Sequence, residues 1–163
     1  MTVFRVGHGY DIHRLQAGRP LILGGVRFAG DRGPAGHSDG DAVLHAVIDA
    51  LLGAAGLDDI GALFPPGDPR FRDADSFALL QDAVARVQAA AWRVENVDIT
   101  VVAEWPRIRP RAGEMRSRVA AGLGIEPERV NLKGKTNEGL DAVGRGEAIA
   151  AWAVALLARD PAS

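Results

Sequence analysis

The sequence contains no cysteine and has no strong excess of charge of one sign, and each of these absences excludes certain kinds of cross-link or ligand. Without cysteine among its 163 residues, no disulfide can form and any zinc ligands must be histidines and carboxylates. The formal net charge is -2, from 19 basic and 21 acidic residues, which argues against binding to nucleic acid or a membrane by bulk electrostatics. A phosphate ligand would therefore need local partners, such as a metal, Arg, Lys or a helix N-terminus.

Long hydrophobic runs are also missing. No apolar run approaches the ~20 residues that a membrane-spanning helix requires, and the first six residues are typical of a strand rather than a signal peptide. We therefore expect a cytoplasmic protein. The length and the 47% hydrophobic content predict a single domain, 1–163, with a sizeable core.

Glycine, in contrast, is abundant. The chain has 20 glycines, well above the average of ~7%. They cluster at 24–25, 30–40, 53–61 and 134–146, a distribution that favours backbone crowded around a ligand over disorder.

The first predicted strand, 2–14, carries two kinds of side chain. Residues two apart in a strand point to the same face, so Asp11 and His13 project side by side. We expect Gly7 and Gly9 to leave open space on that face. The opposite face has the composition of a core and carries Phe4, Val6, His8, Tyr10 and Ile12.

His45 can supply a third ligand from a predicted helix that starts at Ser38 or Asp39 and ends near Ala55. Two histidines and one carboxylate are a usual catalytic zinc set, with the fourth position left for substrate or water. From these residues alone, a histidine pair satisfied by a neighbouring Asp is an equal alternative. Asp41 and Asp49 share a helix stripe with His45 and are expected either to orient its ring or to face solvent.

The remaining elements are predicted from periodicity and from turn residues. The segment 147–159 is ambiguous, because its alanines favour a helix whereas its alternation suits a strand buried on both faces. The other elements are a strand at 20–28 paired with the first strand, a Gly/Pro loop at 29–37, an ordered loop with one helical turn at 57–69, a helix at 76–91 capped by Asp75 or Ser76, a strand at 94–104, a basic turn at 106–111, a helix at 111–122, a strand at 130–135 and a Gly-rich loop to 146.

Five motifs, in this order, resemble those of the 2-C-methyl-D-erythritol 2,4-cyclodiphosphate synthase family. They are Gly7-His-Gly-Tyr-Asp-Ile-His13, Ala35-Gly-His-Ser-Asp-Gly-Asp-Ala-Val-Leu-His45, Asp59-Ile-Gly-Ala-Leu-Phe-Pro65, Lys133-Gly-Lys-Thr-Asn-Glu138 and Gly144-Arg-Gly-Glu147. The resemblance implies an α+β fold with a mixed β-sheet and helices packed on one face. It also implies a homotrimer with active sites between subunits, and makes the last segment a strand near the threefold axis.

The resemblance further implies an enzyme of the non-mevalonate isoprenoid pathway, a phosphorus-oxygen lyase. In the family reaction the 2-phosphate of 4-diphosphocytidyl-2-C-methyl-D-erythritol 2-phosphate attacks the β-phosphorus, and CMP leaves. The attacking oxygen is already anionic, so positioning and charge stabilisation supply most of the catalysis and no general base is required.

Site roles follow from the family by position. Asp11, His13 and His45 match its zinc ligands, and His37 and Ser38 match phosphate contacts, although Ser38 can also be read as a plain helix cap. Thr136 and Glu138 match the opposite wall of the site, which in the family comes from the neighbouring subunit. Thr136 would donate to the transferring phosphate. Glu138 would bind a second ion, Mg2+ or Mn2+, or else is a surface carboxylate. Lys135 stands where some relatives carry a hydroxyl residue.

The expected substrate contacts extend over the rest of the motifs. Asp59 and Gly61 match the ribose contacts, and the loop from Phe64 to Asp68 matches the methylerythritol contacts, although Pro66 replaces a carboxylate there. The cytosine pocket of the family matches Ala103, Pro106, Arg107, Ile108 and Arg109, a segment that can also be read as a solvated basic turn. Asn137 belongs to the fourth motif. Arg145 matches a residue of an axial cavity that binds isoprenoid diphosphate, and Ala142 replaces an aromatic residue there.

Two other functions stay open at this point. One is a zinc-dependent phosphodiesterase, which would activate water and release an open bisphosphate with CMP. The other is a trimeric isoprenoid-diphosphate binding protein whose metal site is inactive.

Overall fold

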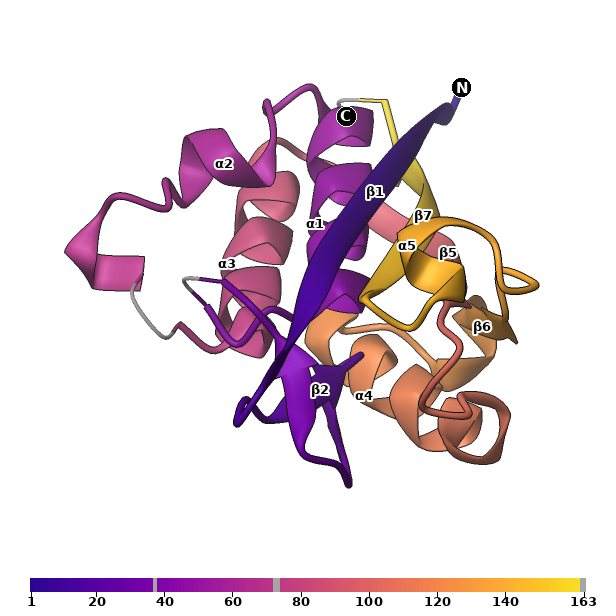
Figure 1. The fold of residues 1–163 in the computed structure, drawn as a ribbon. Helices are drawn as coiled ribbons and strands as arrows, with labels where there is room; N and C mark the ends of the chain where they lie inside the picture. Colours follow the sequence, from indigo (N-terminus) through magenta and orange to yellow (C-terminus); the bar gives the residue numbers. More distant parts are fainter. Residues whose placement is uncertain (37, 72–73, 162–163) are drawn as a thin grey trace.

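The computed structural model describes residues 1–36, 38–71 and 74–161, and a mixed five-stranded sheet forms its centre (Figure 1). The strand order is β4-β1-β7-β5-β6; β5 and β6 run parallel, and the other neighbours run antiparallel. The strands are β1 (Val3–Ala17), β4 (Arg32–Pro34), β5 (Arg93–Val102), β6 (Val130–Lys135) and β7 (Ala148–Arg159).

Three helices, α1 (Ala42–Ala55), α3 (Ser76–Ala89) and α4 (Ala112–Leu123), share one apolar core with the inner face of this sheet. The short helix α5 (Asp141–Gly144) lies on the opposite face, where Val143 packs with Val102 and Ala150. The predicted α+β class is therefore confirmed, whereas α5 departs from the expectation that the helices pack on one face. Within the described ranges, no helix combines the length and the apolar character needed to cross a bilayer.

The close approach of α1 to β1 explains two glycines of the first strand. A Cβ atom added to Gly9 would lie 1.8 Å from the carbonyl oxygen of Ala46, and one added to Gly7 would lie 1.9 Å from that of Ala50. The expected open space beside these glycines is therefore wrong, because the backbone of α1 fills it. This contact holds His45 of α1 over the face of β1 that carries Asp11 and His13.

The other face of β1 also differs from the prediction. Phe4, Val6, Tyr10 and Ile12 were expected in the core, but they are 58%, 68%, 44% and 43% exposed. The pairing of β1 with β7 extends this apolar surface, since Tyr10 lies opposite Trp152 with ring centroids 4.9 Å apart. The same chain thus buries the ligand-bearing face of its first strand and leaves the apolar face uncovered.

The segment after β1 is rearranged relative to the prediction. The expected strand at 20–28 is a separate hairpin, in which β2 (Leu21–Leu23) and β3 (Val26–Phe28) pair with each other around Gly24 and Gly25. The expected loop at 29–37 contains β4, which pairs with the end of β1.

The C-terminal segment 147–159 forms the strand β7, as the family resemblance implies, and not the helix that its alanines favour. Its side chains alternate: Ile149, Ala151 and Ala153 are buried, whereas Trp152 and Val154 are 37% and 42% exposed. The remaining elements are α2 (Ile60–Leu63) and the 3-10 turns η1 (Pro69–Phe71), η2 (Arg109–Arg111) and η3 (Pro127–Arg129).

Candidate metal centre and substrate pockets

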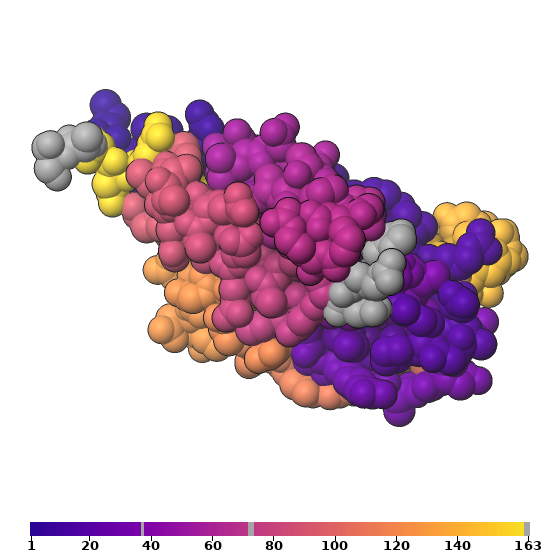
Figure 2. Space-filling model, turned by 90° about the vertical axis from the view of Figure 1, so that its left-hand side faces the viewer, coloured from indigo at the N-terminus to yellow at the C-terminus, as the bar shows by residue number. Residues whose placement is uncertain are grey.

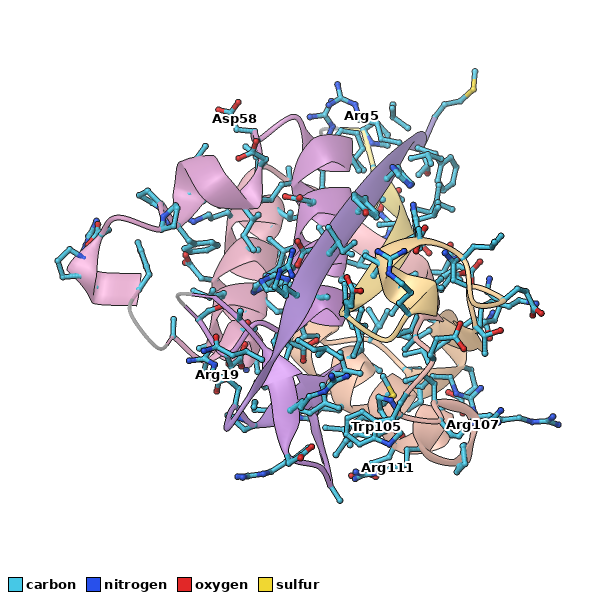
Figure 3. The ribbon with its side chains drawn as sticks, viewed as in Figure 1. Arg5, Arg19, Asp58, Trp105, Arg107 and Arg111 are labelled. Atoms are coloured by element: carbon cyan, nitrogen blue, oxygen red, sulfur yellow. The ribbon has the colours of Figure 1, made fainter. Side chains whose placement is uncertain are left out.

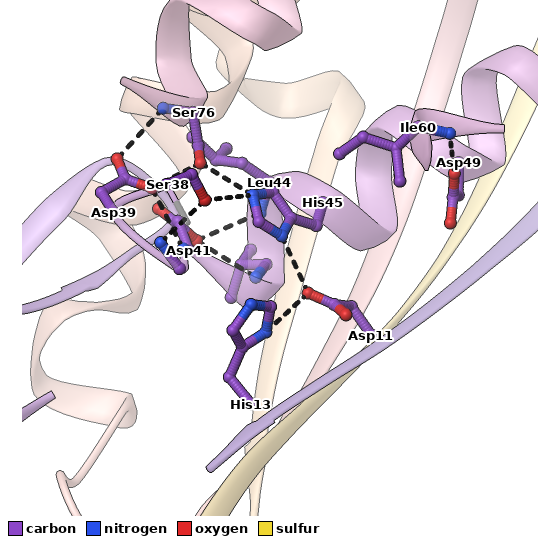
Figure 4. A network of polar contacts seen from close by, with 12 residues as sticks. Asp11, His13, Ser38, Asp39, Asp41, Leu44, His45, Asp49, Ile60 and Ser76 are labelled. Carbon is purple, nitrogen blue, oxygen red and sulfur yellow. Dashed lines mark hydrogen bonds and ion pairs between the residues drawn. The ribbon is translucent and has the colours of Figure 1, made fainter. Parts of the chain in front are cut away.

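Asp11, His13 and His45 come together between β1 and α1 (Figure 4). One ligand atom from each lies within 4.8 Å of the other two. Oδ2 of Asp11 is 2.9 Å from Nδ1 of His13 and 3.0 Å from Nδ1 of His45. The strand spacing that placed the first two residues side by side is confirmed, and α1 brings the third from 34 residues away.

The donor set fits a divalent transition metal. Nδ1 of His13 is buried and, despite its distance to Asp11, has no aligned hydrogen bond among the described residues. Two imidazole nitrogens and a carboxylate oxygen are the ligands that zinc accepts while keeping one position open. The three donors come from two elements and face one another closely enough to be ligands of one ion.

The carboxylate of Asp11 and the imidazole of His45 shift each other's pKa. Burial opposes the ionisation of Asp11, but its contacts with His13 and His45 outweigh burial and lower its pKa to about 2. Burial likewise opposes a charge on His45, yet the hydrogen bond and the negative charge of Asp11 raise the pKa of that imidazole. The site therefore holds an ionised carboxylate and favours positive charge beside it.

The second nitrogen of His45 is held by a residue that sequence reasoning missed. Nε2 lies 2.9 Å from Oγ of Ser76, the first residue of α3, and 3.4 Å from Oγ of Ser38. The hydroxyl of Ser76 donates to Asp39, which also accepts from the Ser76 backbone N–H at 3.1 Å. No sequence pattern joined these residues, because Ser76 lies 31 residues after His45 and was considered only as a helix cap.

Asp41 and Asp49 do not orient His45 as expected. Asp41, rather than Ser38 or Asp39, is the N-cap of α1 and accepts from the backbone N–H groups of Val43 and Leu44. Its oxygens also accept from Gly24 at 2.8 Å and Gly25 at 2.7 Å. Burial raises the pKa of Asp41 to about 6, although the backbone N–H groups that donate to its carboxylate act in the opposite direction.

Asp49 accepts from the backbone N–H of Ile60 at 2.8 Å and so anchors α2 to α1. It thereby holds one wall of a cavity of about 270 Å³ that opens beside the histidines. The cavity is lined by His13, Gly36, Ser38, His45, Ile60, Gly61, Phe64, Pro66, Phe71 and Leu79. Figure 2 shows the segment around α2 lying on the surface next to α3, beside the N-terminal segments in indigo.

Three predicted substrate residues of this half line the cavity, and Asp59 directly precedes Ile60, which also lines it. Ser38, Gly61 and Phe64 line it. Asp59 is exposed and caps α2 through Oδ1, which accepts from Ala62 at 2.8 Å. Asp68, in contrast, forms an ion pair with Arg70 at 2.6 Å and is not among the lining residues.

A second pocket of about 340 Å³ collects most of the remaining predicted residues. It is lined by Ala103, Pro106, Arg107, Ile108, Arg109, Pro110, Gly134, Lys135 and Thr136. The segment that carries Trp105 and Arg107 lies on the other side of the ribbon from the α2 side, which Asp58 marks (Figure 3). One chain therefore presents the two expected halves of a site on different sides.

Thr136 donates to Oε1 of Glu138 at 3.0 Å, and both side chains are exposed. Asn137 is tied to the same region by its backbone N–H, which donates to Glu104 at 2.8 Å. Arg145 pairs with Glu147 at 2.8 Å, and Ala142 lines a third, separate pocket with Ile12, Arg14, Glu147 and Ala148. His37 lies outside the described residues.

These features define the class of the molecule: an α+β protein with a partly buried His/His/Asp cluster that could hold a metal ion and that borders a ligand-sized cavity. Comparison with known proteins then specifies the family. Residues 4–158 match the model of the YgbB family. A 2-C-methyl-D-erythritol 2,4-cyclodiphosphate synthase from Bordetella petrii is 60% identical over 156 residues, which are 96% of this chain and 96% of that protein. The synthase from Moorella thermoacetica is 55% identical and covers 94% of each chain. The chain belongs to this synthase family.

Solved structures agree with this assignment. A CDP-bound form of 2C-methyl-D-erythritol-2,4-cyclodiphosphate synthase superposes with a TM-score of 0.86 at 38% identity, over 94% of this chain and 99% of that one. IspF of Plasmodium falciparum, in a CDP complex, superposes with a TM-score of 0.84 at 34% identity, over 97% of each chain. The bifunctional IspDF of Campylobacter jejuni superposes with a TM-score of 0.94 at 37% identity, and this chain, 98% covered, spans 43% of that longer protein.

Proposed function

We propose that this chain converts 4-diphosphocytidyl-2-C-methyl-D-erythritol 2-phosphate to 2-C-methyl-D-erythritol 2,4-cyclodiphosphate and CMP. The observation that carries the proposal is the Asp11, His13 and His45 cluster at the mouth of a cavity, in a chain 60% identical to a synthase of that name. An oxygen of the 2-phosphate forms a bond to the β-phosphorus, and the bond from that phosphorus to the oxygen of CMP breaks. CMP carries away the electron pair, so the reaction needs no added water.

We assign Zn2+ to the cluster. When bound, the ion would supply Lewis-acid charge stabilisation to a phosphate oxygen and fix the orientation of the diphosphate. The ionised carboxylate of Asp11 and the two imidazoles would hold it. Ser38, whose hydroxyl accepts from the backbone N–H of Gly40, borders the same cavity and is placed to donate to a phosphate oxygen.

The other half of the site is proposed to come from a second copy of the chain. Thr136, Glu138 and Lys135 lie with the second pocket, away from the metal cluster, so one chain alone does not bring them to the same phosphate. The uncovered apolar face of β1 and β7, with Val6, Tyr10 and Trp152, supplies a surface for association. A homotrimer joins neighbouring copies in a closed ring and gives every metal cluster a partner half.

Within that composite site, the roles follow the shape of the pockets. Asp59 uses Oδ1 as a helix cap, and Oδ2 can accept from a ribose hydroxyl. Ala103, Pro106 and Ile108 form the buried part of the second pocket, which suits a flat base. His37 and Thr136 are proposed to contact the transferring phosphate, and Glu138 to hold Mg2+ or Mn2+ on the diphosphate. Asp68 would have to leave Arg70 to reach the methylerythritol hydroxyls.

The axial role proposed for Arg145 is separate from catalysis. Its guanidinium pairs with Glu147 beside the pocket that Ala142 lines, and this pocket also borders Ile12 of the uncovered β1 face. A trimer built on that face would bring three such pockets together, where the arginines could bind an isoprenoid diphosphate.

Phosphorus NMR of the purified protein with Zn2+, Mg2+ and the cytidine substrate tests the function. We expect two coupled resonances of a cyclic diphosphate together with stoichiometric CMP. An open bisphosphate with CMP would instead identify a phosphodiesterase. Unchanged substrate under these conditions would refute both enzymatic assignments.

A further inference from the structure

A chain of polar contacts continues behind the metal cluster, on the side of His45 that faces away from Asp11 (Figure 4). It runs from Nε2 of His45 to Oγ of Ser76 over 2.9 Å, and from that hydroxyl to Oδ1 of Asp39. Ser76 is fully buried and His45 is 8% exposed. Water is therefore excluded from the contact between His45 and Ser76, whereas Asp39 is half-buried.

The direction of each hydrogen bond follows from what its partners can do. The Asp39 carboxylate is an acceptor, and it takes both the hydroxyl and the backbone N–H of Ser76. The Ser76 hydroxyl has then donated its only hydrogen, and its oxygen can only accept from His45. Nε2 of His45 must consequently carry a proton, so the proton that a metal ion would displace is the one that Nδ1 donates to Asp11.

Resting on the zinc assignment above, we propose that Ser76 and Asp39 are positioning residues that hold His45 in the tautomer whose Nδ1 binds the metal. Nδ1 is the nitrogen that lies 3.0 Å from Asp11 and faces the other two donors. Ser76, 31 positions after His45, thus fixes the orientation of the ring and keeps a proton on Nε2, so that Nδ1 is the nitrogen left to bind the ion.

The same contacts tie the metal site to the substrate cavity. Ser76 is the first residue of α3, and Leu79, one turn later, lines the cavity beside His45. Asp39 also accepts from the backbone N–H of Asp41, the cap of α1. The ends of two helices are therefore joined through the ligand His45, so that the cavity wall and the metal ligand keep a fixed relation.

Three variants separate this role from a merely structural one. Ser76→Ala removes the acceptor for Nε2. Asp39→Asn places an amide donor beside Oγ, which turns the Ser76 hydroxyl toward His45 and drives the ring proton to Nδ1. Asp75→Ala is the matched control, because Asp75 caps the same end of α3 through Phe77 at 2.9 Å and is exposed.

Each protein is titrated with Zn2+ against a chromophoric chelator, and the His45 tautomer is read from imidazole ¹H–¹⁵N correlation spectra. We expect zinc affinity to fall ~10-fold in Ser76→Ala and ~100-fold in Asp39→Asn, in the range known for residues that orient metal-binding histidines. Asp75→Ala should stay within about twofold of the unmodified protein. The Nε2 proton should be lost from Asp39→Asn, and circular dichroism identifies any variant that is unfolded.

The possible failures are distinguishable. If the unmodified protein takes up no Zn2+, the metal assignment is overturned, and this inference with it. If it binds Zn2+ and a folded Ser76→Ala or Asp39→Asn binds it within about twofold with an unchanged tautomer, only the positioning role is overturned. An equal loss in Asp75→Ala would also overturn it, because the effect would then belong to the helix end.

Discussion

His45 and Thr136 line different pockets of the molecule, and their surroundings also differ. His45 is 8% exposed, lies in a well-packed helix and uses both ring nitrogens in contacts with side chains from other elements. Thr136 is exposed at the end of a sheet-edge strand, and its hydroxyl contacts Glu138, which is also exposed. Both residues are expected to act on the same phosphate.

The difference shows which half of the site is complete within one chain. The half with the His/His/Asp cluster is partly buried and its donor atoms lie within 4.8 Å of one another, so the fold of a single copy brings them together. The half around Thr136 has cationic and hydroxyl groups beside a pocket but lacks surrounding protein to exclude water. An exposed set of this kind becomes a precise site only when a second surface closes over it, which is the role we propose for the neighbouring subunit.

The largest expected effect is the loss of the metal half. His45→Ala leaves Asp11 and His13 with too few donors, and we expect zinc to be lost. Activity should fall by at least ~10³-fold, because a bound metal supplies several kcal/mol of transition-state stabilisation. Metal analysis and phosphorus NMR measure both effects. Asp49→Asn, one turn along the same helix, is the control and should keep its zinc. Full zinc in His45→Ala would refute the ligand assignment.

The division between chains can be tested by mixing two inactive proteins. Thr136→Ala should bind zinc normally but lose activity, whereas His45→Ala keeps the other half intact. Trimers reassembled from equal amounts of both contain sites in which neither half is altered, and random assortment predicts that about a quarter of the wild-type activity returns. No recovery, with mixed trimers demonstrated by mass spectrometry, would show that both residues act within one chain.

A stability comparison on α1 tests why the metal half is so well determined. Gly9→Ala forces a Cβ to within 1.8 Å of the Ala46 oxygen, so α1 must move away from β1. We expect an unfolding free energy lower by about 3 kcal/mol. Gly53→Ala, at an exposed position of α1 with open space around the added atom, should instead gain ~1 kcal/mol from helix propensity. Urea unfolding at one protein concentration measures both, and equal effects would contradict the close-packing explanation.

The features that could be predicted from the sequence depend on contacts between residues close together in the chain. Asp11 and His13 are two residues apart on a strand, and strand geometry alone places them side by side. The helix of His45 was also predicted from its local pattern, with an end at Ala55 that the structure confirms. Bringing that helix over that strand required a contact across 34 residues, which the family motifs implied and no periodicity could show.

The errors have the same origin. Phe4, Val6, Tyr10 and Ile12 look like core residues because apolar side chains usually mark a buried face, but a surface left for another copy has the same composition. Gly7 and Gly9 predict open space beside the strand, whereas the backbone of α1 fills that space. Ser76 and Asp39 are both short polar residues near helix starts, so their pattern predicts helix caps and gives no sign of the hydrogen bond between them, 37 residues apart.

The smallest expected effect concerns the exposed charges of the second pocket. Arg107 and Arg109 are solvent-exposed at its rim, and Arg107 extends away from the ribbon (Figure 3). Rim charges mainly attract an anionic ligand, and salt screens them. Arg107→Gln should therefore lower kcat/KM by about threefold at low ionic strength and by less at ~1 M salt, with zinc content unchanged. Steady-state kinetics across a salt series measures this effect. A large loss of kcat that salt does not reduce would mean that Arg107 contacts the reacting phosphates. The pocket around Thr136 would then be an ordered part of the active site and not an exposed rim.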